Sequence, residues 1–105
     1  MTGTSLPEIS VISMVRNDSF FAARWIKYYG EHLGSENLFL ILDGHDQPFP
    51  EGSESINVLR LPRKEQGRSG GDRSRARLVS CLARALFHRY DIVIAHDIDE
   101  ILVID

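Results

Sequence analysis

The sequence predicts an α/β fold with an open, mostly parallel sheet and flanking helices. Two observations indicate this class. Short apolar runs rich in Ile, Val and Leu recur along the chain, and stretches with helical periodicity separate most of them. Continuous apolar strands that alternate with helices are typical of parallel sheets buried on both faces. The length of 105 residues corresponds to one small domain, so residues 1–105 are interpreted as a single domain.

The first half of the chain is expected to hold two strands joined by a helix. Ile9–Val15 is an apolar run that predicts a buried strand. Ser19–Leu33 has aromatic and aliphatic residues at helical spacing, polar residues that can cap its start, and Gly34 at the C-cap position. Asn37–Leu42 predicts the second strand, and Asp43–Ser55, which contains prolines and glycines, predicts a loop.

The second half continues this alternation. Ile56–Leu61 predicts a third strand, and the polar, basic segment Arg63–Gly71 is expected to be a mobile loop. A long helix is expected over residues 72–89, before a fourth strand at Asp91–Ala95 and a short fifth strand at Ile101–Ile104. The expected buried face of the long helix consists of Ala76, Val79, Leu82, Ala83 and Leu86.

The bulk composition argues against several classes of protein. A formal net charge of −3 does not suggest a general nucleic-acid binder. The single cysteine, Cys81, can form no intrachain disulfide and is expected to be a buried, inert thiol. The N-terminus lacks the apolar region of a signal peptide, and no apolar run is long enough to span a bilayer. A cytoplasmic protein without a transmembrane segment is therefore expected.

Three carboxylates, those of Asp97, Asp99 and Glu100, follow the fourth predicted strand within four residues. In an extended chain Asp97 and Asp99 point to the same side, where they repel each other unless a cation neutralises them. Mg²⁺ and Mn²⁺ are suited to such a pair together with substrate phosphates. The alternative is a solvated strand end or a helix cap. His96 points to the opposite side and is interpreted as a packed or hydrogen-bonded residue.

Ligands of open parallel sheets lie beyond the carboxyl ends of the strands, which directs attention to two further features. Asp43 ends the second strand before a glycine, and this pattern suits either a ligand-facing carboxylate or an ordinary turn. His45 and Asp46 are expected to face solvent. Nine of the twelve Lys and Arg residues lie between Arg60 and Arg89. One or two of them are expected to meet a diphosphate, and the rest to form a solvated face.

The order and spacing of several motifs resemble the family-two-like bacterial glycosyltransferases. The similarity extends over residues 9–104. Its first part comprises Val15-Arg16-Asn17-Asp18, Trp25, Tyr28-Tyr29, Leu33-Gly34 and Leu40-Ile41-Leu42-Asp43-Gly44. Its last part comprises Tyr90-Asp91-Ile92-Val93-Ile94 and Asp97-Ile98-Asp99-Glu100. The aromatic residues of the first helix are nevertheless interpreted mainly as core, because they recur at helical spacing.

The resemblance implies a Rossmann-like fold of the GT-A type that binds a nucleotide-diphospho-sugar. It implies that Asp43 contacts the nucleoside, that Asn17 and Asp18 line the base pocket, and that Arg75 of the long helix approaches the nucleotide. It also implies a bound Mn²⁺ or Mg²⁺. Asp97 and Asp99 would serve as the D-x-D motif, with Asp99 in direct contact with the metal and Asp97 nearer the ribose or a metal-bound water.

Three features depart from the family pattern. Gly30 follows the helix tyrosines where the family has a histidine, and His45 stands where it has a serine. The chain also stops at Asp105, whereas family members continue into an acceptor-binding half that supplies the catalytic base in inverting enzymes. The resemblance therefore implies the donor- and metal-binding part of a glycosyltransferase, truncated after the D-x-D motif. It leaves open whether this part is active alone, names no catalytic residue, and leaves the acceptor, a cell-surface glycan or a lipid, undefined.

Two other functions stay open on the sequence. One is a non-catalytic module that binds a nucleotide, RNA or another polyanion, which would lose affinity steeply with salt and need no metal. The other is a metal-dependent phosphohydrolase, which is also an α/β protein with aspartates at strand ends. Its nucleophilic aspartate usually follows the first strand, where Asn17-Asp18 is a poor substitute.

Overall fold

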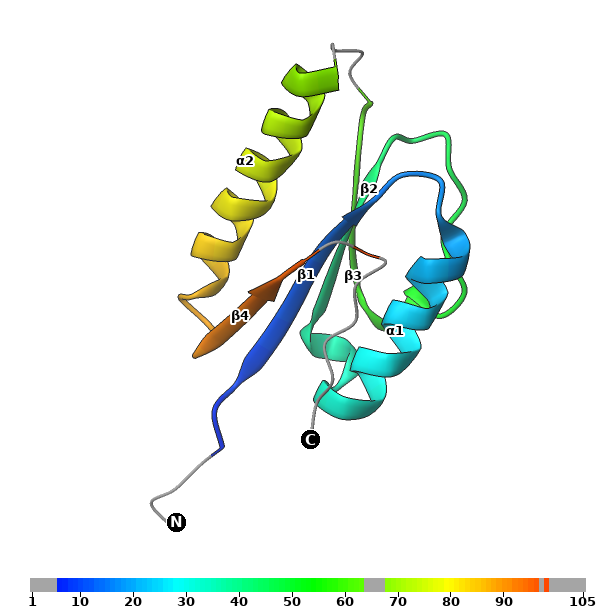
Figure 1. The fold of residues 1–105 in the computed structure, drawn as a ribbon. Coiled ribbons are helices and arrows are strands. Elements are labelled where there is room, and N and C mark those ends of the chain that lie inside the picture. Colours follow the sequence, from blue (N-terminus) through cyan, green and yellow to red (C-terminus); the bar gives the residue numbers. More distant parts are fainter. Residues whose placement is uncertain (1–5, 64–67, 97, 99–105) are drawn as a thin grey trace.

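The computed structural model describes residues 6–63, 68–96 and 98. These residues form one sheet of four strands in the order β3-β2-β1-β4 (Figure 1). All neighbouring strands are parallel. The strands are β1 (Ile9–Val15), β2 (Leu38–Asp43), β3 (Asn57–Leu61) and β4 (Ile92–Ala95). The predicted α/β class and parallel sheet are thus confirmed, and each strand lies within one residue of its expected bounds.

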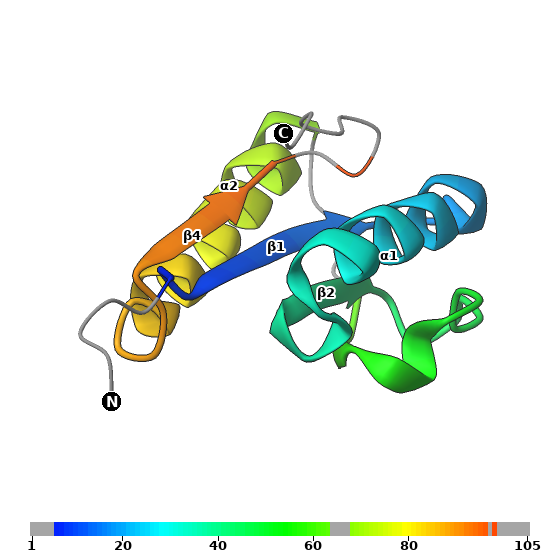
Figure 2. The ribbon, with the colours of Figure 1, turned by 90° about the horizontal axis from the view of Figure 1, so that it is seen from below.

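One helix packs on each face of the sheet. Helix α1 (Ser19–Leu33) contacts β1 and β2, while helix α2 (Arg68–Leu86) contacts β1 and β4. Figures 1 and 2 show the two helices on either side of the strands. Two short 3₁₀ helices, η1 (Ser35–Asn37) and η2 (Ser53–Ser55), lie in the connections that lead into β2 and β3. No helix in the described part of the chain has the length and apolarity that crossing a bilayer requires.

The strand order contains a reversal that defines where a ligand would bind. From β1 the chain adds β2 and then β3 on one side, and it returns to place β4 on the other side of β1. The connection that leaves β1 contains α1 and covers one face of the sheet, whereas α2, which leads into β4, covers the other face. In open α/β sheets this switch point opens a crevice at the carboxyl ends of the two strands. Arg16 and Asn17 follow β1 at this edge, and His96 follows β4.

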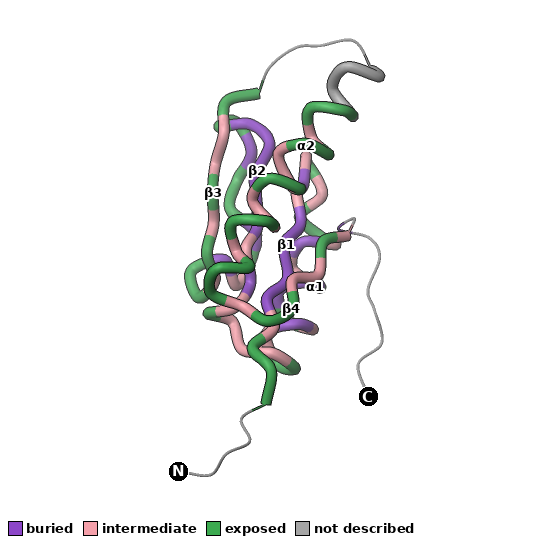
Figure 3. The backbone as a smooth tube through the Cα atoms, turned by 90° about the vertical axis from the view of Figure 1, so that its left-hand side faces the viewer, coloured by how far each residue is buried: buried purple, intermediate pink, exposed green. Residues whose placement is uncertain are grey.

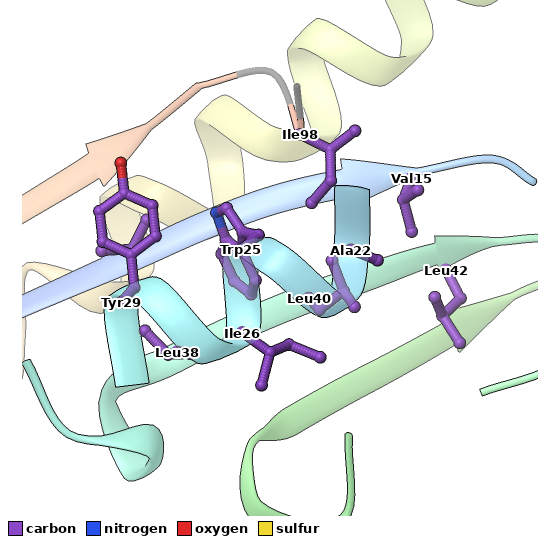
Figure 4. Close-up of a cluster of buried hydrophobic side chains, with 10 residues drawn as sticks. Val15, Ala22, Trp25, Ile26, Tyr29, Leu38, Leu40, Leu42 and Ile98 are labelled. Carbon is purple, nitrogen blue, oxygen red and sulfur yellow. The ribbon is translucent and has the colours of Figure 1, made fainter. Parts of the chain in front are cut away.

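The main core lies between α1 and the two central strands (Figure 4). Ala22, Trp25, Ile26 and Tyr29 recur three or four residues apart, so they share one face of α1, and all four are buried. They pack against alternate residues of the strands, namely Val11, Val15, Leu38, Leu40 and Leu42. The aromatic side chains of Trp25 and Tyr29 are thus core residues, as expected from their spacing.

The opposite face of the sheet is less well covered. Figure 3 shows the buried central strands β1 and β2 flanked by half-buried and exposed edge strands. On β3, Leu59 points to this face, because its neighbour Val58 packs toward α1, and Leu59 remains 44% exposed. The inward residues of α2, such as Val79, Leu82 and Leu86, are half-buried rather than fully buried.

The bounds expected for the long helix were wrong at both ends. The helix begins at Arg68, so residues 68–71 are helical instead of part of the loop, and residues 64–67 lie outside the described part. Two glycines lower helix propensity by only about 1 kcal/mol each, which the rest of a long helix can offset. The helix ends at Leu86, after which i→i−3 hydrogen bonds at residues 87–89 tighten the chain.

The inward face of the helix also differs from the expected one. Ala76 is exposed, and Leu78 is half-buried in its place. Cys81 is exposed as well, because it lies outside the inward stripe formed by Leu78, Val79 and Leu82. The expected fifth strand at Ile101–Ile104 lies outside the described residues.

Candidate functional site

The site is built around Asp43, the last residue of β2. Its side chain is only 12% exposed, and its Oδ2 atom accepts hydrogen bonds from two arginines that are far apart in the sequence. Arg63 Nη1, just after β3, lies 2.9 Å away; Arg75 of α2 approaches with Nε at 3.2 Å and Nη2 at 3.0 Å. The parallel sheet thus brings the ends of β2 and β3 and one turn of α2 to a single point.

Both guanidinium groups keep hydrogen-bonding capacity beyond Asp43. A guanidinium carries five N–H donors, and the bonds to Asp43 use one in Arg63 and two in Arg75. The side chains are 43% and 42% exposed. Asp43 therefore orients two cations whose outer sides are accessible to an anionic ligand.

A second ionic contact links the ends of β1 and β2. Arg16 donates to both carboxylate oxygens of Asp46, at 2.6 and 2.9 Å, and to the backbone oxygen of Asp43 at 3.0 Å. The hydrogen bond from Arg16 lowers the pKa of Asp46 to about 2, and the same bond raises the pKa of Arg16. Asp46 and His45 are exposed, as expected. This contact fixes the loop after β2 to the end of β1.

Arg60 adds a further cation at this edge. Its Nη2 atom donates to the backbone oxygen of His45, and its guanidinium lies 4.9 Å from the centre of the Phe49 ring. The residues joined by these contacts, Arg16, Arg60, Arg63, Arg75, Asp43 and Asp46, include four cations and two anions. These six side chains therefore carry an excess of two positive charges in a chain whose net charge is −3. Such an excess favours an anion over a cation as ligand.

The turn between β1 and α1 holds the two residues expected in the base pocket. Asp18 is the N-cap of α1, and its Oδ1 atom accepts a hydrogen bond of 3.4 Å from the amide of Phe21. Asn17 is exposed and adopts a positive φ of 54°, which asparagine tolerates better than most residues. Its amide donates to the side chain of Gln47, a buried residue that the sequence analysis did not single out.

The end of β4 is held by two other elements. Trp25 Nε1 lies 3.2 Å from His96 Nε2, and Ser13 Oγ donates to the backbone oxygen of His96 at 2.7 Å. Because the indole nitrogen is only a donor, His96 Nε2 must be the acceptor and carry no proton. This confirms that His96 is a packed, hydrogen-bonded residue, and it shows that its Nε2 atom is already engaged.

The structure brings together part of the predicted site. Asp43 and Arg75 are in direct contact, and Asn17 is joined to the loop after β2 through Gln47. Asp97 and Asp99 lie outside the described residues. The sequence could not single out Arg63 as a site residue, because it is one of nine Lys and Arg residues between Arg60 and Arg89. Arg16 stood within a motif, but nothing in the sequence indicated that it pairs with Asp46.

The described residues contain no metal centre of their own. No three His, Cys, Asp or Glu side chains gather there in a way that could hold a metal ion. Asp43 is poorly suited as a ligand, because two guanidinium groups already neutralise it. A divalent cation at this edge would therefore need ligands other than the described side chains.

The chain was compared with known proteins on three levels. No protein-family model, no curated protein and no solved structure matches it.

Proposed function

We propose that this chain binds a nucleotide-diphospho-sugar at the carboxyl edge of its sheet, as the donor- and metal-binding part of a GT-A type glycosyltransferase. The observation that carries the proposal is the convergence of Arg63 and Arg75 on Asp43 at that edge. Guanidinium groups bind phosphate oxygens through paired, charge-assisted hydrogen bonds. Two of them bound to one carboxylate, with side chains 43% and 42% exposed, match the charge of a diphosphate.

Each residue has a distinct part in this proposal. Arg63 and Arg75 bind the diphosphate, and Asp43 holds both guanidinium groups in place before the donor arrives. Asn17 and Asp18 border the nucleoside, while Asp18 also caps α1. The direct contact between Asp43 and the nucleoside stays a prediction. Holding the donor in one orientation contributes to rate by removing the entropy cost of alignment.

The metal enters the proposal through the acidic motif. A Mn²⁺ or Mg²⁺ ion held by Asp97 and Asp99 would supply neutralisation of the charge that develops on the departing diphosphate. The positive charges of Arg63 and Arg75 would also neutralise part of the charge on the departing diphosphate. The acceptor, expected to be a cell-surface glycan or a lipid, has no residue assigned to it in the described part of the chain.

A polyanion-binding module is the second candidate, because the same excess of positive charge would attract RNA. The two functions differ in measurable ways. Polyanion binding releases counterions and so weakens steeply with salt, and it has no metal requirement. A phosphohydrolase finds less support, since the carboxylate after β1 serves as a helix cap.

Calorimetric titration of nucleotide diphosphates, with and without Mn²⁺, tests the proposal. We expect Mn²⁺-dependent binding that Arg75→Gln weakens by about 1.5–3 kcal/mol, roughly tenfold to a hundredfold. Arg84→Gln is the matched control, because Arg84 is exposed on the same helix and away from Asp43. Asp99→Ala should abolish the Mn²⁺-dependent binding.

Two results would contradict the proposal. One is equal affinity in the Arg75→Gln and Arg84→Gln variants. The other is metal-independent binding of single-stranded RNA that weakens steeply with salt while nucleotide diphosphates do not bind. The second result would favour the polyanion-binding module.

A further inference from the structure

The loop after β2 reaches back to the end of β1 through a buried side chain. Gln47 is only 5% exposed. Its Nε2 atom donates to the backbone oxygen of Val15 at 3.3 Å, and its Oε1 atom accepts from the backbone amide of Asn17 at 3.0 Å. The carboxamide thus bonds the residues on either side of Arg16.

This pattern is that of a residue paired in a parallel ladder. There, the N–H of a residue donates to the residue before its partner, and its C=O accepts from the residue after its partner. The pairing of β1 with β2 ends at Val15 and Leu42. Beyond this point the main chain of β2 bonds only β3, and the amide of Gly44 donates to the Leu61 oxygen at 2.8 Å. The side chain of Gln47 therefore continues the ladder of β1 after the main chain of β2 has left it.

Arg16 lies between the two residues that Gln47 bonds, and its side chain reaches from the end of β1 to the loop after β2. Its guanidinium binds Asp46 and the backbone oxygen of Asp43. Gly44 leaves space for the guanidinium because it has no Cβ atom, which would collide with Arg16. Its φ of +123° also favours glycine. Arg16 and Gln47 donate four hydrogen bonds and Gln47 accepts a fifth, and together these bonds hold the two strand ends in place.

We infer that Gln47 is a positioning residue for the nucleotide site, an inference that rests on the proposed function. By bonding its amide, Gln47 holds Asn17 in the left-handed conformation at the switch point. Such a conformation has an intrinsic cost for residues other than glycine and persists only where the surroundings impose it. The turn after β1 is thereby set in its binding geometry before a ligand is present, which lowers the ordering cost of binding.

The test combines amide hydrogen exchange with nucleotide titration on the full chain. Gln47→Met keeps the length and apolar stem of the side chain but loses both hydrogen bonds. We expect Asn17 to exchange at least about tenfold faster, and the affinity for a nucleotide diphosphate to fall by about tenfold. Unchanged protection of the Leu40 amide, in the middle of β2, shows that the sheet is intact.

Two further variants sharpen the result. Gln47→Glu keeps an acceptor for the Asn17 amide but cannot donate to the Val15 oxygen and adds a negative charge, so its Asn17 protection should recover in part while its affinity for the diphosphate stays low. Ser55→Ala removes a side-chain bond to the Gly52 oxygen in the same connection, away from the carboxyl edge, and should change neither measurement. If Gln47→Met does not fold, Gln47→Asn replaces it, since its shorter amide cannot reach both partners.

Each outcome decides between the possibilities. Unchanged exchange of Asn17 in the Met or Asn variant overturns the inference, as does faster exchange with unaltered nucleotide affinity. If the unmodified chain binds no nucleotide diphosphate while Asn17 protection depends on Gln47, the proposed function fails. The hydrogen bonds of Gln47 to the end of β1 are then confirmed without a role in nucleotide binding.

Discussion

Asp46 illustrates how a single contact gives an exposed residue a defined chemical state. Its carboxylate accepts two hydrogen bonds from Arg16, and no local pattern predicts this pair, because the partners are 30 positions apart. The ordinary pKa of 3.8 falls to about 2 as a result, chiefly through the hydrogen bond from Arg16. A group whose pKa is lower in the folded state stabilises the fold above its unfolded pKa and loses that effect as the pH falls.

This linkage predicts the pH dependence of one variant. The free energy of unfolding of the unmodified chain should exceed that of Asp46→Asn at neutral pH. The difference should shrink as the pH falls from about 4 to about 2, the interval between the two pKa values. Urea denaturation across this pH range measures it. A difference that stays constant down to pH 2 would show that the Arg16 contact does not form in solution.

At the scale of elements, helix α1 was the most predictable part of the chain. Its bounds match the expected Ser19–Leu33, because capping residue, apolar spacing and terminal glycine all agree. Helix α2 was less predictable, since its glycines lie inside the helix and its inward face is only half-buried. Tertiary contacts with β1 and β4, which no local pattern reveals, decide where it packs.

Two glycines, one inside α1 and one directly after it, should respond oppositely to substitution by alanine. Gly30 is helical, and a Cβ atom there would meet only the Ser35 hydroxyl, at 2.9 Å, which can rotate away. Gly30→Ala should therefore stabilise the fold by about 0.5–1 kcal/mol. Gly34 follows the helix with φ of +94°, so Gly34→Ala should destabilise it by about 1–3 kcal/mol. Thermal unfolding of both variants checks the pair, and a shift of the same sign in both would refute the assignment.

At the scale of the whole molecule, elements that are far apart in the sequence are joined where β4 ends. Trp25 of α1 is fully buried and donates to His96 after β4, 71 residues away. Ser13 in the middle of β1 binds the same residue. The stability of the edge where β1 and β4 end therefore depends on α1 as well as on the sheet.

Trp25→Phe should lower the free energy of unfolding by about 1–3 kcal/mol, through the lost hydrogen bond and the smaller ring. Phe20→Leu is the control on the same helix: Phe20 is 67% exposed, so its change should stay within about 0.5 kcal/mol. Urea denaturation followed by circular dichroism measures both. Equal midpoints for the two variants would contradict a stabilising link between Trp25 and His96.

The sequence by itself determined the class of fold, the order of the elements and the residues that follow each strand. These follow from local patterns: apolar runs, helical spacing and capping residues act over a few positions. Only the tertiary structure decided that β4 lies beside β1, that Arg63 and Arg75 meet on Asp43, and that Gln47 continues the ladder of β1. Those contacts join residues 20 to 83 positions apart, and their energies depend on how the sheet brings strand ends together. No pattern confined to neighbouring residues contains that information.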